Sequence, residues 1–162
     1  MNYPFKMTMT TVRYLTLFFV LSAFLFSCSN GEETRQGAAT HTEIDSNLPL
    51  AEQIDLYIEQ DRYDEALELL SSEDPDSPDT LVQLEKTHLN YGLHSMNTFD
   101  QTEMRTRMNK ALHHFTEVLN INPENQVARE QIEQIMMIYA TIPDREPEPE
   151  VLEGLREVGF NY

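Results

Sequence analysis

Apolar side chains recur every three or four residues along most of the chain after residue 47. This interval places them on one face of an α-helix, and no segment shows the strict alternation that a half-buried strand requires. The pattern therefore predicts an all-α fold. Its five predicted helices cover about residues 48–60, 63–70, 80–95, 101–120 and 124–141.

Proline, asparagine and aspartate separate the predicted helices. Pro49 suits a first helical turn, where its missing N–H costs nothing. Asp79 and Thr80 are expected to cap the third helix. Asn122 precedes Pro123, which disfavours helical geometry and should end the fourth helix. These residues divide the chain into short helices that reverse direction.

The C-terminal segment differs in composition from the helices before it. Residues 143–149 are rich in proline and glutamate, which predicts an extended spacer. Residues 151–158 then predict a short amphipathic helix that ends at Gly159. We expect this helix to cover the exposed end of the helical domain. Alternatively it docks on another protein, with Phe160 and Tyr162 as its anchors.

Two segments share one spacing between a small residue and a proline. Ala66 is followed twelve residues later by Pro78, and Ala111 is followed twelve residues later by Pro123. A large apolar residue stands four positions after each alanine. This spacing resembles the second helix of the tetratricopeptide repeat, in which a small residue lets two helices approach, a bulky one fills the groove beside it, and proline ends the unit.

The resemblance covers residues 47–141 and implies a short solenoid of helical hairpins, about two repeats followed by a capping helix. Tyr57 and Tyr91 stand where the first helices of the family usually carry tyrosine. The tryptophan and glycine common in those helices are absent, and the second repeat is longer than usual between Tyr91 and Ala111. A generic helical bundle is the alternative.

In this family the first helix of each pair lines a concave groove that holds a peptide or a helix of a partner. The resemblance implies that eight residues line such a groove here. They are Asp55, Glu59, Glu85, Leu89, Leu93, Glu130, Gln134 and Met137. This lining is acidic with apolar patches, so it is expected to bind a basic, partly apolar segment of another protein. Alternatively, its acidic positions are ordinary solvated surface.

The first 27 residues carry two basic and no acidic side chains, and an apolar run shorter than a bilayer span. The run closes with Leu25-Phe26-Ser27-Cys28, which resembles the cleavage site of bacterial lipoprotein signal peptides, although Phe26 departs from the usual residue. The resemblance implies acylation of Cys28 and a lipid anchor on the mature chain. The alternatives are an ordinary signal peptide with an incidental cysteine, and an uncleaved anchor.

These patterns divide the chain into four parts. Residues 1–27 are the predicted signal peptide, and residues 28–47 are the lipidated cysteine and a flexible tether. Residues 48–142 are the repeat-like helical domain, and residues 143–162 are the spacer and the C-terminal helix. The tether has almost no large apolar side chains, so burial cannot repay the entropy lost on ordering it.

The chain is strongly acidic, with 28 Asp and Glu residues against 11 Lys and Arg residues and a formal net charge of −17. Anionic phosphates would be repelled, which argues against a nucleic-acid partner. The same charge steers partners with basic faces toward the protein.

Candidate catalytic and metal sites are weak. The single cysteine is assigned to acylation, and five glycines include no phosphate-binding loop. His88, His94, His113 and His114 suggest a metal site, but neighbours on a helix point about 100° apart and no metal-ligand motif accompanies them. Surface or groove-lining histidine is the preferred interpretation. We therefore expect no enzymatic activity, no cofactor and no metal.

Together these features predict a lipid-anchored protein of the bacterial envelope that acts as a protein-binding adaptor or assembly factor. We expect it at the outer membrane, on the periplasmic face or at the cell surface. The alternatives are an envelope protein that binds a ligand or a metal with its helices, and a self-associating structural lipoprotein.

Overall fold

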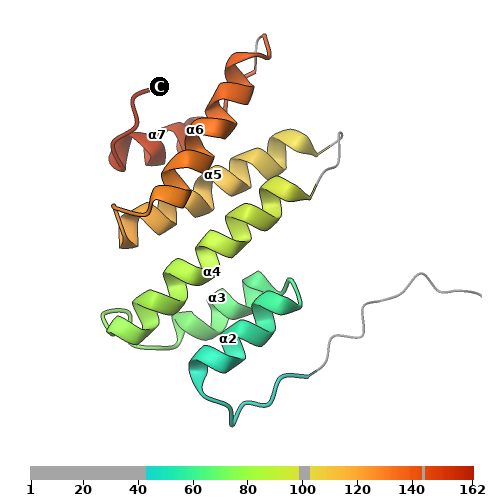
Figure 1. Cartoon of the computed structure of the whole chain (residues 1–162), viewed down its shortest axis with the longest axis vertical. Helices are drawn as coiled ribbons and strands as arrows, with labels where there is room; N and C mark the ends of the chain where they lie inside the picture. Colours follow the sequence, from blue (N-terminus) through green and yellow to red (C-terminus); the bar gives the residue numbers. More distant parts are fainter. Residues whose placement is uncertain (1–42, 99–102, 144) are drawn as a thin grey trace, which may run out of the picture. The chain divides into compact units, whose positions relative to one another are not determined.

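The computed structural model describes residues 43–98, 103–143 and 145–162, all within one unit that spans residues 41–162. Over these residues the chain forms six helices and no strand, which confirms the predicted all-α fold (Figure 1). None of these helices is long and apolar enough to cross a bilayer. The predicted signal peptide, Cys28 and most of the predicted tether lie outside the described residues. The helices are α2 (Leu50–Glu59), α3 (Tyr63–Ser71), α4 (Pro78–Asn97), α5 (Met104–Ile121), α6 (Gln126–Ala140) and α7 (Pro149–Glu157).

The helices lie close to their predicted positions, and one predicted cap is wrong. α4 begins at Pro78, so Asp79 and Thr80 belong to its first turn and do not cap it. The reason is that proline has a φ angle suited to the first helical position. α6 has a side-chain cap instead, because Asn125 Oδ1 accepts a hydrogen bond of 3.0 Å from the Ala128 N–H.

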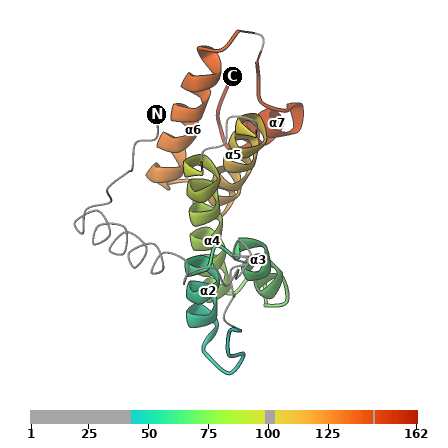
Figure 2. The same ribbon diagram turned by 90° about the vertical axis from the view of Figure 1, so that its right-hand side faces the viewer.

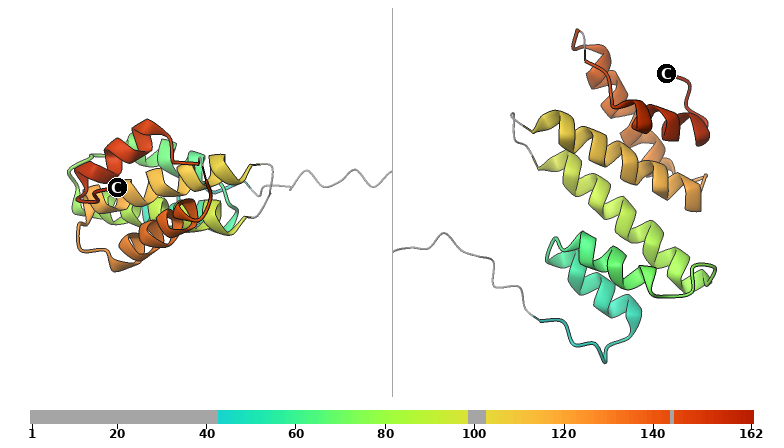
Figure 3. Two further views of the ribbon diagram at one scale, coloured as in Figure 1. Left: turned by 90° about the horizontal axis from the view of Figure 1, so that it is seen from above. Right: turned by 180° about the vertical axis from the view of Figure 1, so that it is seen from behind.

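Consecutive helices from α2 to α6 reverse direction, and each contacts the next (Figures 1 and 2). In addition, α2 contacts α4, and α7 contacts α5 (Figure 3). The most extensive contact is the one between α4 and α5, the two longest helices. This pair therefore connects the first hairpin, α2–α3, with α6 and α7.

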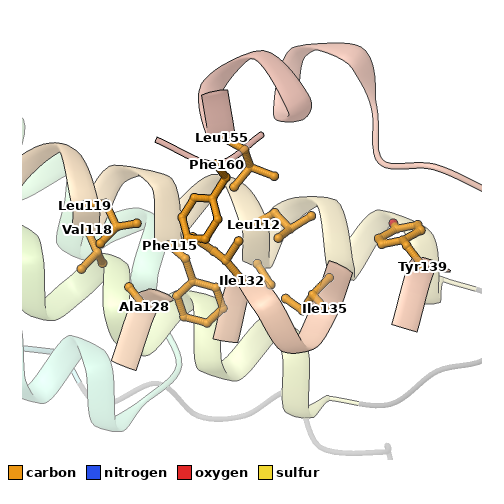
Figure 4. Packing of buried hydrophobic residues seen from close by; sticks show 11 residues of the cluster. Leu112, Phe115, Val118, Leu119, Ala128, Ile132, Ile135, Tyr139, Leu155 and Phe160 are labelled. Carbon is orange, nitrogen blue, oxygen red and sulfur yellow. The ribbon is translucent and has the colours of Figure 1, made fainter. Parts of the chain in front are cut away.

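Buried apolar side chains form two separate clusters. The smaller cluster joins Ile54 of α2 to Ala66 and Leu70 of α3. The larger cluster combines α5, α6 and the C-terminal segment (Figure 4). α4 packs against both, with Leu84 on the smaller cluster and Leu89 on the larger one. The larger cluster consists of Ala111, Leu112, Phe115, Val118, Leu119, Ala128, Ile132, Ile135, Tyr139, Leu155 and Phe160.

The C-terminal helix completes the larger cluster. Leu155 of α7 is fully buried, and Phe160 just beyond the helix is 9% exposed. Gly159 has a φ of +95°, a left-handed conformation that glycine adopts without a Cβ clash. This turn lets the Phe160 N–H donate a hydrogen bond to the Leu155 carbonyl at 2.9 Å. α7 thus packs on α5 as part of the domain, and Phe160 is buried rather than available as a docking anchor.

Gly92 of α4 lies directly against the ring of Phe115 of α5. A Cβ atom added at Gly92 would come within 2.6 Å of that ring, far inside the carbon–carbon contact distance of roughly 3.5 Å. Phe115 is completely buried, so neighbouring side chains prevent its ring from moving aside. Glycine at position 92 therefore sets how closely α4 and α5 approach.

We expect Gly92→Ala to lower the free energy of unfolding by up to about 2 kcal/mol. The overpacking against Phe115 outweighs the gain of about 1 kcal/mol that alanine brings to a helix. Gly154→Ala is the matched control, because its Cβ would lie 3.4 Å from Thr116 Cγ2, an ordinary contact. Urea unfolding followed by circular dichroism compares the two variants. A Gly92→Ala protein as stable as Gly154→Ala would contradict the close approach of α4 and α5.

Candidate functional site

The eight residues expected to line a groove fall into two groups. In the first, Asp55 forms an ion pair with Lys86, and Glu85 accepts hydrogen bonds from another part of the chain. Leu89 and Leu93 of this group pack against the larger cluster. The second group has exposed side chains, one on α2 and three on α6. A partner could contact these side chains without disturbing the packing of the domain. This group comprises Glu59, Glu130, Gln134 and Met137.

Glu85 of α4 fixes the turn between α5 and α6. Its Oε1 accepts hydrogen bonds from Asn122 Nδ2 and Asn125 Nδ2, both at 2.8 Å. The Oδ1 atoms of the two asparagines accept hydrogen bonds inside the turn. Asn122 Oδ1 accepts from the Glu124 N–H, and Asn125 Oδ1 accepts from the Ala128 N–H. Because one carboxylate orients both amides, the role of Glu85 is to hold α4 against the start of α6.

We expect Glu85→Ala to destabilise the domain by about 1–3 kcal/mol, because it leaves two amide donors without their acceptor. Glu130→Ala removes the same kind of side chain from an exposed position on α6. It should change the stability by no more than about 0.5 kcal/mol. Urea unfolding of the two variants tests this difference, and equal stabilities would show that Glu85 does not hold the turn.

A column of rings links α3, α4 and α5. Tyr63 of α3 stacks on Tyr91 of α4 with ring centroids 4.7 Å apart, and Tyr91 stacks on His114 of α5 at 4.1 Å. His88 Nδ1 lies 3.1 Å from His114 Nδ1, within hydrogen-bond distance. The Tyr91 hydroxyl donates to Asp64 Oδ1 of α3 at 2.9 Å. The column thus joins three helices, and none of its stacked rings belongs to either apolar cluster.

Both histidines of the column are held in the neutral form. A hydrogen bond between two Nδ1 atoms needs one donor and one acceptor, so the two rings cannot both be protonated. Burial lowers the pKa of His88 below its usual value. Burial, followed by the proximity of His88, His113 and Lys110, lowers the pKa of His114 to about 3. A proton on the His114 ring is therefore disfavoured in the folded protein.

This arrangement predicts lower stability in mild acid. The unfolded chain takes up a proton at His114 below a pH of about 6.5, whereas the folded chain takes it up only near its pKa of about 3. Stability should therefore fall as the pH drops through this window, by at most about 1.4 kcal/mol per pH unit for one group.

His114→Phe should keep the stacking on Tyr91 and reduce the loss of stability between pH 6.5 and 5. His113→Gln, at the exposed neighbouring position, should keep the pH dependence of the unsubstituted protein. Urea midpoints at several pH values in this range measure the slope. The same slope in His114→Phe as in His113→Gln would rule out a contribution from the buried ring.

The other two histidines of the metal hypothesis make separate contacts. His94 Nδ1 lies 3.1 Å from Asp61 Oδ1, and His113 Nδ1 lies 3.9 Å from Glu117 Oε1. Of the four histidines, only His88 and His114 hydrogen-bond to each other within the described ranges. In these ranges no three His, Cys, Asp or Glu side chains are placed to hold a metal ion.

A pocket of about 830 Å³ is lined by the start of α5, the end of α6 and α7. Arg105, Arg145 and Arg156 contribute to its wall, together with Tyr139 and Tyr162. None of these arginines was predicted to belong to a site, because the packing of three helices brings them together. One hint of such a site was present in the sequence. With only 11 Lys and Arg residues against 28 Asp and Glu residues, each basic side chain was a candidate for a specific role.

Comparisons with protein-family models, with curated proteins and with solved structures find no match. The tetratricopeptide resemblance thus stays a prediction based on the spacing of alanine, bulky apolar residue and proline.

Proposed function

We propose that this chain is a lipid-anchored protein of the bacterial cell envelope that binds another envelope protein through the exposed face of α6. The observation that carries the proposal is a stripe of four exposed side chains spaced three or four residues apart on that helix. Two of them are large and apolar, with Val127 44% and Met137 65% exposed. The stripe consists of Val127, Glu130, Gln134 and Met137.

The α6 stripe suits a basic, partly apolar segment. Glu130 and Gln134 offer hydrogen-bond acceptors, and Met137 is a flexible side chain that adapts to varied apolar surfaces. The net charge of −17 attracts basic partners from a distance. The opposite face of α6 packs in the larger cluster, so the helix is held rigidly while its outer face stays open.

The membrane location rests on the N-terminal sequence. Leu25-Phe26-Ser27-Cys28 closes an apolar run of signal-peptide length. Acylation of Cys28 with more than one chain would hold the protein stably on the membrane. The polar residues that follow would let the helical domain reach a partner near the membrane surface.

Photo-crosslinking in cells tests this function. A photoreactive amino acid at position 137 of the full-length protein should form one discrete crosslink to an envelope protein, identified by mass spectrometry. The same amino acid at Val82, an equally exposed apolar position on α4, is the matched control and should not form it. Glu130→Lys should reduce the crosslink about three- to tenfold, because a basic partner would be repelled.

Cys28→Ser supplies the second arm of this experiment. It removes the acylation site, so the protein should leave the membrane fraction and lose the crosslink. No crosslink at position 137, or the same one at position 82, would contradict binding through α6. Retention of Cys28→Ser in the membrane fraction would contradict the lipid anchor.

A further inference from the structure

Three arginines that line one pocket stand apart from the other basic residues. In the described ranges, the other Lys and Arg side chains contact a carboxylate, a tyrosine or a backbone carbonyl. Arg105, Arg145 and Arg156 form no ion pair or hydrogen bond with any described residue. All three line the pocket formed by α5, α6 and α7. Among the described residues, the cations that have neither an ion pair nor a hydrogen bond are thus gathered in one pocket.

The charge of this pocket is opposite to that of the chain. Its lining includes one acidic residue, Glu146, against the three arginines. The whole chain carries a net charge of −17, so an anion would be repelled over most of its surface. Guanidinium groups bind carboxylate and phosphate oxygens through paired hydrogen bonds. The pocket is therefore a place where an anion could be stabilised on this molecule.

Tyr139 adds a second, independent indication of a ligand. Its side chain lines the same pocket but is only 7% exposed, and its hydroxyl oxygen is buried without a hydrogen-bond partner among the described residues. Buried polar atoms usually have a partner, because leaving one unpaired is unfavourable. Burial raises the pKa of Tyr139, so its hydroxyl keeps its proton and can donate a hydrogen bond.

The rest of the wall is apolar. Met136 and Ile142 near the end of α6, and Leu152 of α7, line the pocket. Its volume of about 830 Å³ lies within the range of sites that hold small molecules. A ligand that fills it therefore needs an apolar part as well as a charged one.

We infer that this pocket binds a small amphiphilic anion. Its carboxylate or phosphate group contacts Arg105, Arg145 and Arg156, and its apolar part lies against Met136, Ile142 and Leu152. This inference goes beyond protein binding through α6 and does not depend on it, because the α6 stripe lies on other positions of the helix.

Isothermal titration calorimetry on the full-length protein tests the inference with four probes. Decanoate and decyl phosphate, used below their critical micelle concentrations, carry the two headgroups on one chain. Decanol lacks the charge, and inorganic phosphate lacks the chain. At least one amphiphilic anion should bind at one molecule per chain, and more tightly than both decanol and inorganic phosphate. The amphiphile with the lower dissociation constant shows whether the pocket prefers a carboxylate or a phosphate headgroup.

Variants locate the binding site. The double variant Arg105→Gln/Arg156→Gln should weaken binding of the preferred amphiphile at least tenfold. Arg62→Gln is the control, because it removes an arginine just before α3 and outside the pocket, and it should leave binding unchanged. The apolar N-terminal residues are common to all these proteins, so they cannot produce the difference. Circular dichroism melting curves show whether each variant is folded.

Tyr139→Phe should weaken binding several-fold without the loss of any charge, because it removes the hydroxyl donor alone. Equal binding by the double arginine variant and Arg62→Gln would overturn the inference. Binding of decanol as tight as that of both anions would also overturn it, as would the absence of binding by either amphiphile.

Discussion

The contact between Gly92 and Phe115 is the constraint on which the rest of the domain depends. It brings α4 and α5 together along the most extensive helix contact in the described residues. α4 then carries α2 and α3 on one side, and α5 carries α6 and α7 on the other. A larger side chain at position 92 would separate α4 from the ring at the centre of the larger cluster. Both candidate binding surfaces are built from helices that this pair supports.

Polar contacts fix the junctions that the apolar clusters leave open. Glu85 holds the turn between α5 and α6 through Asn122 and Asn125, and the stacked rings of Tyr91 and His114 join α4 to α5. These contacts use side chains that a search for binding residues would have selected. The two candidate binding surfaces, the exposed face of α6 and the arginine-lined pocket, use none of these side chains.

The sequence predicts the helices well, because their apolar spacing directly reflects which face is buried. Ala66, Leu70, Ala111 and Phe115, chosen for their spacing, are all buried. Contacts between distant segments could not be predicted in the same way. Glu85 has the appearance of a surface residue until the turn at Asn122 and Asn125 is placed beside it. The arginine pocket likewise forms only where three helices and a loop come together, and no local sequence pattern predicts that they do. The isolated glycine at position 92 was a local sign of a close helix contact.

Hydrogen exchange of the full-length protein, read at single amides, tests most directly whether the domain depends on the α4–α5 pair. If it does, amides in the middle of both helices exchange slowest, and only through global unfolding. Amides of α2 and α3, which rest on the smaller cluster, exchange faster and open while α4 and α5 remain folded. The account would be contradicted if α6 and α7 stayed protected while α4 or α5 exchanged, because the binding surfaces would then be supported by something other than this pair.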